Sequence, residues 1–332
     1  LLLASGVDAA SVAVSGQCWG QRHRGGDCLG ADFWGVAAVY STGTAFMMLT
    51  PGLKAYCWGD SSYGGECGQD VQGVTHVYSN WYAFVALNHE TGAAWCWGPS
   101  AYGGGCTGKN FAGATDVFST WWAFMALNRN SGEAWCWGES DYGGDCAGLD
   151  FTGVTHVRSN AYAFVALDAN AGKSQCWGEP SYGGNCDDVD FTHVSEVYST
   201  MYAFVALRAD RGTARCWGLA AYGGNCAAVD FQDVTAVYST GHAFLALSER
   251  TGAATCWGDP AYGGDCSGMS FWGFATRVRS TWYAFVAWNE ATGAFRCWGE
   301  ALYGADCSGI DFRGVTEVYT TGYACMAVNR AT

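Results

Sequence analysis

An eleven-residue stretch that begins and ends with cysteine recurs eight times along the chain, and it constrains the fold more than any other feature. A typical copy, residues 96–106, reads CWGPSAYGGGC, and neighbouring copies lie 39 to 41 residues apart. A fixed period of about 40 residues is typical of solenoids, propellers and other arrays, in which no unit buries its apolar faces alone. We therefore expect residues 1–332 to form a single repeat domain.

The cysteines predict one disulfide in each repeat. The chain has 17 cysteines, and all but one fall in pairs that are ten residues apart. Such pairs persist as disulfides in secretory or extracellular compartments. Zinc is the alternative, but a zinc site needs two close cysteine pairs, or cysteines with histidines, and no histidine recurs here. The predicted pairs are Cys18–Cys28, Cys57–Cys67, Cys96–Cys106, Cys136–Cys146, Cys176–Cys186, Cys216–Cys226, Cys256–Cys266 and Cys297–Cys307.

Cys325 is the cysteine without a partner in this scheme. Its place in the other repeats holds a phenylalanine, such as Phe285. We interpret Cys325 as a small buried thiol in a phenylalanine position, and the alternative is a bridge to another molecule.

Charge and hydropathy narrow the classes of partner. The net charge of −14 argues against nucleic acid, whose phosphates would be repelled, and it permits a basic partner. No run of 18 apolar residues is present, so we expect no membrane span. The opening LLLASGVDAA fits either the end of a signal peptide or a degenerate repeat strand.

Each repeat reads as three antiparallel strands. In one repeat, residues 73–80 alternate between apolar and polar, residues 83–87 are apolar throughout, and residues 93–97 follow a Gly92 hairpin. Helix signals are absent. A small sheet with two apolar faces must lie between copies of itself, which favours a β-propeller over an open β-solenoid.

The two ends of the sequence complement each other. The last repeat stops before its third strand, and residues 11–20 supply a strand of that type. The sequence therefore predicts an all-β propeller of about eight three- to four-stranded blades, seven complete and one closed by both termini. A fragment of a longer array is the alternative.

The repeat resembles that of the regulator of chromosome condensation family. The matching residues are Val77-Tyr78-Ser79, the apolar run 83–87, Thr91-Gly92, Trp97-Gly98 and Gly103-Gly104. In repeat length the chain is most similar to the secreted β-lactamase inhibitory protein of the second type. The resemblance implies a propeller, seven-bladed in those relatives, that works by binding proteins. Eight repeats and a cysteine pair in each are departures from that pattern.

The two positions before each Ala-Phe pair vary most among the repeats, from glycine to tryptophan. They fall at the turn between the first and second strands, where a propeller would gather them on one face. Exposed aromatic side chains are typical of binding surfaces, because tyrosine and tryptophan are enriched in hot spots. The alternative is that these rings pack on each other and cap the core. The candidate binding residues are Trp81, Tyr82, Trp121, Trp122, Tyr162, Met201, Tyr202, His242, Trp282, Tyr283 and Tyr323.

Recurring carboxylates offer a second candidate site. Aspartates such as Asp145 and Asp265 precede the second cysteine, and others such as Asp32, Asp150 and Asp190 precede a phenylalanine. Calcium prefers clustered carboxylates, but short Asx side chains also stabilise turns, and we favour the turns. We therefore expect no metal or other cofactor.

The function that the sequence predicts is a secreted, non-catalytic module that binds a protein or copies of itself. A lectin that uses the aromatic ring as sugar platforms is the alternative. No hydrolase, zinc-protease or phosphate-loop motif is found, and near-identical repeats place like residues together. We expect the Cys-Trp-Gly tryptophans to lie in the core between blades.

Overall fold

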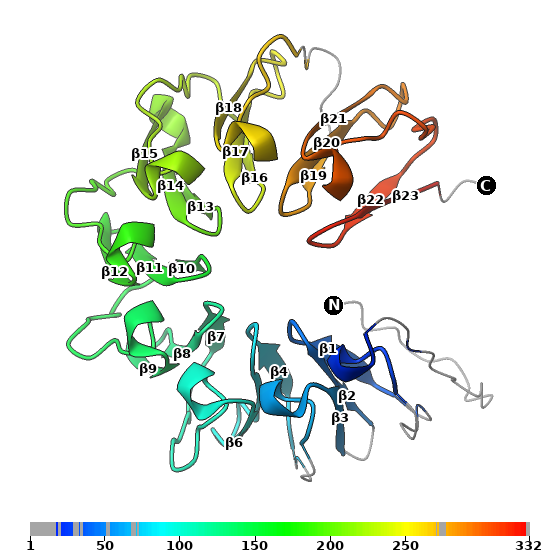
Figure 1. Ribbon diagram of the computed structural model, residues 1–332. Helices are drawn as coiled ribbons and strands as arrows, with labels where there is room; N and C mark the ends of the chain where they lie inside the picture. Colours follow the sequence, from blue (N-terminus) through cyan, green and yellow to red (C-terminus); the bar gives the residue numbers. More distant parts are fainter. Residues whose placement is uncertain are drawn as a thin grey trace. The chain divides into compact units, whose positions relative to one another are not determined.

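The computed structural model describes residues 18, 21–28, 33, 36–50, 54–67, 71, 73–269, 271 and 277–329. Across these residues the chain forms seven three-stranded sheets and one two-stranded sheet, with the strands of each sheet in chain order (Figure 1). Neighbouring strands are antiparallel. This is the blade architecture that the sequence predicted for an all-β propeller of about eight repeats.

The strands of the first four sheets are β1 (Ala38–Ser41), β2 (Ala45–Leu49), β3 (Ala55–Gly59), β4 (His76–Ser79), β5 (Phe84–Leu87), β6 (Ala94–Trp97), β7 (Asp116–Ser119), β8 (Ala123–Asn128), β9 (Glu133–Gly138), β10 (His156–Ser159), β11 (Ala163–Asp168) and β12 (Lys173–Gly178). The remaining strands are β13 (Glu196–Ser199), β14 (Ala203–Arg208), β15 (Thr213–Gly218), β16 (Ala236–Ser239), β17 (Ala243–Leu247), β18 (Ala254–Gly258), β19 (Arg277–Ser280), β20 (Ala284–Trp288), β21 (Phe295–Gly299), β22 (Glu317–Thr320) and β23 (Cys325–Val328).

The chain comprises two compact units. Unit 1 comprises Leu1–Phe124 and Trp137–Glu139, and unit 2 comprises Met125–Cys136 and Ser140–Thr332. The sheet β7-β8-β9 is divided between them. We describe each unit by itself, and a single domain over residues 1–332 stays a prediction.

The middle strand of each blade is the most buried one. In β11, Ala163 through Leu167 are at most 1 % exposed, which confirms the apolar run as a strand covered on both faces. Phe164 lies opposite Trp177 of β12, and the two rings stack with centroids 5.0 Å apart. Equivalent stacked pairs occur in five other sheets and fix the register of their second and third strands: Phe46–Trp58, Phe124–Trp137, Phe204–Trp217, Phe244–Trp257 and Phe285–Trp298.

Within unit 2 consecutive sheets pack face to face. Val165 and Leu167 of one sheet are buried against Val197, Phe204 and Trp217 of the next. Equivalent residues of the following sheets form equivalent clusters. Apolar residues on both faces of each sheet are therefore explained by a neighbouring sheet on each side.

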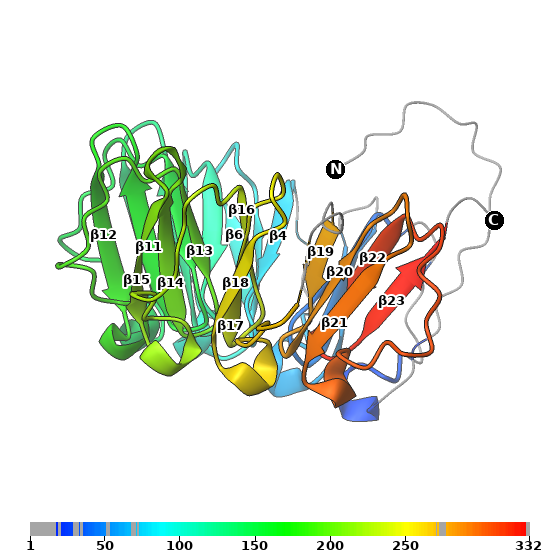
Figure 2. The same ribbon diagram turned by 90° about the horizontal axis from the view of Figure 1, so that it is seen from above.

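Short 3-10 helices follow the third strands, where the sequence showed no helix signal. In unit 2 they lie along one edge of the sheets, the lower edge in Figure 2. A three-residue helix leaves no apolar periodicity to detect, so the prediction missed it. The helices of the Tyr-Gly-Gly turns are η2 (Ser61–Tyr63), η3 (Ser100–Tyr102), η4 (Ser140–Tyr142), η5 (Pro180–Tyr182), η7 (Ala220–Tyr222), η8 (Pro260–Tyr262) and η9 (Ala301–Tyr303).

The glycine after each of these helices has two reasons to be glycine. Gly183 ends η5 with a φ of 103°, which L side chains rarely adopt. A Cβ at Gly183 would also lie 2.6 Å from the Phe204 ring of the next blade. The turn can therefore approach the neighbouring core only because no side chain intervenes.

The last sheet has the two strands β22 and β23 in the part of the chain that the structure describes. Of residues 11–20, predicted to supply its third strand, only Cys18 is among the described residues. Closure of this blade by both termini therefore stays a prediction. No helix in the described residues is long and apolar enough to cross a membrane.

Candidate binding edge

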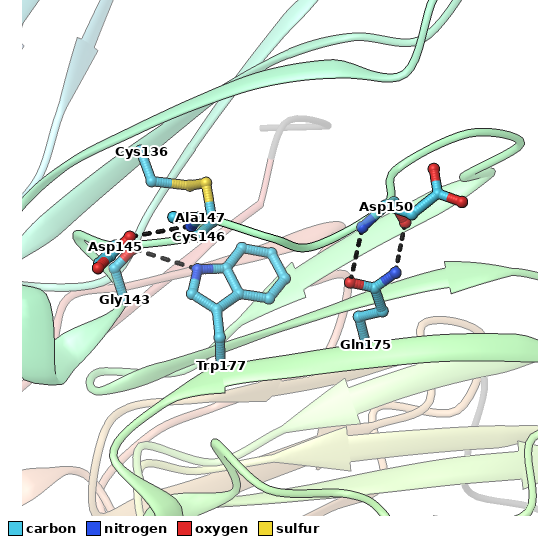
Figure 3. Close-up of a disulfide and its surroundings, with 8 residues drawn as sticks. All are labelled: Cys136, Gly143, Asp145, Cys146, Ala147, Asp150, Gln175 and Trp177. Atoms are coloured by element: carbon cyan, nitrogen blue, oxygen red, sulfur yellow. Dashed lines mark hydrogen bonds between the residues drawn. A yellow bond between two sulfur atoms is a disulfide. The ribbon is translucent and has the colours of Figure 1, made fainter.

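The predicted disulfides are present in all eight repeats of the described chain, each between cysteines ten residues apart. Figure 3 shows Cys136–Cys146, which ties β9 to the loop that leads to the next blade. From that next blade, the Trp177 Nε1–H donates to the Gly143 carbonyl at 3.1 Å. A disulfide and a tryptophan thus hold the same turn from two sides.

This tryptophan contact recurs between consecutive repeats, which confirms that the Cys-Trp-Gly tryptophans lie between blades. Equivalent bonds are made by Trp58, Trp137, Trp217, Trp257 and Trp298. Trp97 differs, since its buried Nε1 has no hydrogen-bond partner among the described residues. Trp19 lies outside the described residues.

The recurring carboxylates stabilise turns, as the sequence analysis favoured. The Asp145 Oδ1 accepts from the Ala147 N–H at 2.9 Å, and the Asp150 Oδ1 accepts from the Thr152 N–H at 2.9 Å. Asp190 accepts hydrogen bonds from both the backbone N–H and the hydroxyl of Thr192, and these bonds lower the pKa of its carboxyl to about 2. In the described residues no three His, Cys, Asp or Glu side chains gather into a group suited to a metal ion. Asp32 lies outside those residues.

Cys325 occupies the predicted phenylalanine position. A Cβ on Gly304 would meet the Cys325 Sγ at 3.0 Å, where other repeats place a phenylalanine ring against the equivalent glycine. Cys325 is half-buried and free of a disulfide, and burial raises the pKa of its thiol. The expectation of a small thiol in this slot is confirmed, although its burial is partial.

The second of the two variable positions forms a row of rings along unit 2. Tyr162 stacks on Tyr202 with centroids 5.6 Å apart, and the next ring along, His242, lies 5.6 Å from Tyr202. His242 in turn stacks on Tyr283 at 5.2 Å, and Tyr283 lies 5.8 Å from Tyr323. Within this unit the variable rings therefore contact one another from repeat to repeat.

The tyrosines of the Tyr-Gly-Gly turns interleave with this row. Tyr182 lies 4.8 Å from Tyr162 and 5.4 Å from Tyr202, and Tyr222 lies 4.8 Å from Tyr202 and 5.2 Å from His242. These tyrosines are not among the candidate residues that the sequence predicted. Their signal is a constant offset of 20 or 21 residues from the variable ring. We call the combined set the unit 2 aromatic row: Tyr142, Tyr162, Tyr182, Tyr202, Tyr222, His242, Tyr262, Tyr283, Tyr303 and Tyr323.

Unit 1 holds a shorter row of the same kind. Tyr82 contacts Tyr63, Tyr102 and Trp122 at centroid distances of 5.2, 5.0 and 4.6 Å. Beside it, Trp81 and Trp121 stack at 4.9 Å. The predicted aromatic residues of both units thus contact other aromatic side chains of the same unit.

Most rings of the rows are half-buried. The sequence expectation of exposed turn residues is wrong for His242, which is only 8 % exposed because rings from four neighbouring turns and strands surround it. Tyr323 at the end of the row is 50 % exposed. Burial, followed by the neighbouring Tyr202 and Tyr182, raises the pKa of Tyr162 to about 12. The rows therefore combine core packing with a solvent-facing rim.

At the first variable position, each glycine lies against a large side chain of an adjacent blade. A Cβ at Gly241 would lie 2.9 Å from Met201 Cε, and one at Gly322 would lie 2.8 Å from Trp282 Cδ2. In unit 1, a Cβ at Gly43 would lie 2.4 Å from Trp81 Cε2. Volumes therefore compensate between neighbours, so variation from glycine to tryptophan does not by itself indicate exposure.

Backbone bonds link these turns from blade to blade in unit 2. The Met201 N–H donates to the Gly241 carbonyl at 2.9 Å, and the Gly241 N–H donates to the Trp282 carbonyl at 2.8 Å. Two residues earlier, at the end of the first strand, hydroxyl groups donate in the opposite direction along the chain: the Ser239 Oγ donates to the Ser199 carbonyl at 2.7 Å. The edge that carries the aromatic row is therefore held by bonds in both directions.

No model of a known protein family matches the chain, and no curated protein matches it in sequence. Solved structures do. The ectodomain of the receptor kinase CR4 from Physcomitrella patens is 15% identical, with 80% of this chain and 73% of that chain covered and a TM-score of 0.47. The CRINKLY WD40 ectodomain of the receptor kinase ACR4 from Arabidopsis thaliana is 16% identical, with 80% and 95% covered and a TM-score of 0.41.

Yeast RCC1 is also among them. This protein, also named Prp20 and solved bound to Kap60, is 13% identical, with 90% of this chain and 76% of that chain covered and a TM-score of 0.42. Identities this low concern the fold alone. The repeats resemble those of the regulator of chromosome condensation family and add a disulfide to each.

Proposed function

We propose that the chain is an extracellular, non-catalytic binding module whose aromatic rows contact a protein partner. The observation that carries the proposal is the unit 2 aromatic row, in which half-buried rings support one another from both sides. Rigid aromatic side chains give large contact area at a low entropic cost, which is why they dominate protein-binding surfaces. A disulfide in every repeat supports an oxidising compartment.

The ring contacts favour a protein over a sugar. A sugar platform needs a ring face that is open to solvent, but Tyr202 is contacted by Tyr162, Tyr182, Tyr222 and His242. What the row offers to a ligand is therefore ring edges and hydroxyls, which suit a protein surface. A glycan array with wild type and a Tyr82→Ala, Tyr162→Ala, Tyr202→Ala variant tests the sugar alternative, which is supported only by binding that the variant loses.

Photo-cross-linking tests the protein-binding proposal. A benzoyl-phenylalanine replaces Tyr323 on the aromatic row or Ile310 in a loop, two side chains that are 50 % and 49 % exposed. In the extracellular fluid of the source cells, the probe at position 323 should give a discrete protein adduct, and excess unlabelled chain should suppress that adduct. The probe at position 310 should give no such adduct. Equal adducts from both positions, or none from 323, would contradict the proposal. Adducts between two copies of the chain would identify self-association.

A further inference from the structure

We infer that the partner of the unit 2 aromatic row is a basic protein segment, whose lysine and arginine side chains meet carboxylates that stand beside the rings. The inference rests on the proposed function and gives its partner a chemistry. Three of the carboxylates, Glu179, Asp259 and Glu300, follow a Cys-Trp-Gly strand directly, and the fourth, Asp141, lies inside η4.

Backbone bonds place Glu179, Asp259 and Glu300 on the edge that carries the row. The Glu179 N–H donates to the Tyr162 carbonyl at 3.1 Å, the Asp259 N–H donates to the His242 carbonyl at 3.0 Å, and the Glu300 N–H donates to the Tyr283 carbonyl at 3.0 Å. Each of these three acidic residues is therefore joined by a backbone hydrogen bond to a residue whose ring belongs to the row. All three side chains are partly exposed.

No lysine or arginine balances them in the turns of this edge, where His242 is the one titratable nitrogen base among the residues of the row. Residues 139–146, 179–186, 219–226, 259–266 and 300–307 contain no lysine or arginine, and neither do the turns 160–163, 200–203, 240–243, 281–284 and 321–324. The nearest arginines along the chain, Arg158 and Arg279, lie inside strands β10 and β19, and Arg158 is paired with Glu196 at 3.2 Å. The edge is thus an acidic rim around aromatic rings.

Helix capping does not explain this charge. Glu179, Asp259 and Glu300 do accept a backbone N–H in the 3-10 turn that follows each of them. However, Leu219 holds the equivalent position before η7 and makes no side-chain cap, and the turn forms in the same way. Neutral serine, threonine or asparagine would cap as well, and glutamate is not among the preferred capping residues. The repeated acid is therefore not needed for the fold.

Aromatic rings beside carboxylates suit basic side chains for two reasons. A guanidinium or ammonium group gains from both the ring quadrupole and the ion pair. Like charges along one edge also speed the approach of a basic partner and reject an acidic one. Arginine should be preferred to lysine, because its planar group can stack on a ring while it pairs with a carboxylate.

The test uses the purified full chain and three fluorescent peptides: nona-arginine, nona-lysine and nona-glutamate. The edge variant carries Glu179→Gln, Asp259→Asn and Glu300→Gln, which keep an oxygen for capping. The control variant carries Asp187→Asn, Asp188→Asn and Asp210→Asn, which are exposed residues outside the turns of this edge, and it changes the net charge by the same amount. Binding is measured by fluorescence anisotropy at low and physiological salt.

Wild type should bind nona-arginine more tightly than nona-lysine and should not bind nona-glutamate. The edge variant should weaken nona-arginine binding about tenfold, which is the order expected for three partly exposed ion pairs, while the control variant retains most of it. If both variants lose nona-arginine affinity equally, the binding depends only on the net charge of the chain, and the inference is overturned.

The photo-cross-linking experiment separates the two ideas. If the adduct at position 323 forms and the edge variant does not weaken it, the row binds a protein that is not basic, and only the inference fails. If no adduct forms at all, the proposed function fails as well.

Discussion

At the residue scale, most tryptophans of the Cys-Trp-Gly strands both pack between blades and donate a hydrogen bond to the preceding turn. Trp177 is 6 % exposed, stacks on Phe164 of its own blade, and bonds to Gly143 of the preceding turn. Trp97 is equally buried, at 6 %, but its Nε1 has no hydrogen-bond partner among the described residues. The two residues therefore separate the contribution of the hydrogen bond from that of the ring.

Trp177→Phe should lower the free energy of unfolding by about 1 to 2 kcal/mol more than Trp97→Phe does, because only the first leaves a buried carbonyl without its donor. Urea unfolding of both variants, followed by tryptophan fluorescence and circular dichroism, gives the comparison. Equal losses would mean that the Nε1 bond to Gly143 contributes nothing beyond packing. The alanine variants at both positions should each lose roughly 3 to 5 kcal/mol.

At the element scale, the unit 2 aromatic row joins parts of different repeats. Tyr202 lies between the turn tyrosines Tyr182 and Tyr222. The variable rings at positions 162, 242 and 283 lie between two turn tyrosines in the same way. Each ring is thereby removed from part of its solvent, which makes the charged phenolate unfavourable. The raised pKa values of Tyr162, Tyr202 and Tyr283 follow first from this burial.

Alkaline pH should therefore weaken the row. The pKa of Tyr162 is raised from 10.0 to about 12, so the stability that its neutral phenol contributes is fully present below pH 10 and is lost as the pH rises through 12. The difference in phenolate absorbance between wild type and Tyr162→Phe should show a midpoint well above 10. A midpoint at the ordinary tyrosine value would mean that the ring is not packed as described.

At the scale of the whole molecule, the eight disulfides of the described repeats each close a short loop. All but Cys18–Cys28 join the third strand of a described sheet to the loop that leads to the next blade. A short loop limits how far each bridge can restrict the unfolded chain. Many small restrictions, distributed evenly, stabilise a repeat array without depending on any one repeat.

Removal of one bridge, by Cys216→Ser with Cys226→Ser, should lower the unfolding free energy by about 2 to 4 kcal/mol. Cys325→Ser is the matched control, since Cys325 is not in a disulfide, and it should change stability by less than about 1 kcal/mol. Thermal and urea unfolding under oxidising conditions measure both. If Cys325→Ser lowers the unfolding free energy as much as the double variant does, then the packing of the cysteine side chains, and not the disulfide, stabilises the repeat.

The sequence was sufficient for the features that one repeat contains. The strands around residues 73–97, the Cys96–Cys106 bridge and the Asx turns are local patterns that repetition makes clear. Features that join two repeats were not predictable from a single one. The burial of His242 depends on rings from other turns, and the compensation of Gly241 by Met201 depends on a residue 40 positions away. The 3-10 helices were missed because three residues carry no periodic signal.

The hydrogen bonds that join the serines and the turns of neighbouring repeats in unit 2 have a consequence for how the coding sequence can change. Every bond of this kind joins the same two positions in neighbouring repeats: Ser199 donates to Ser159, Ser239 to Ser199, and Ser280 to Ser239. Duplication or deletion of one whole repeat in the coding sequence leaves each remaining junction with both of its partners. An insertion of a few residues within a strand instead shifts donors away from acceptors. The gain and loss of complete copies is therefore the mutational step that this architecture tolerates best.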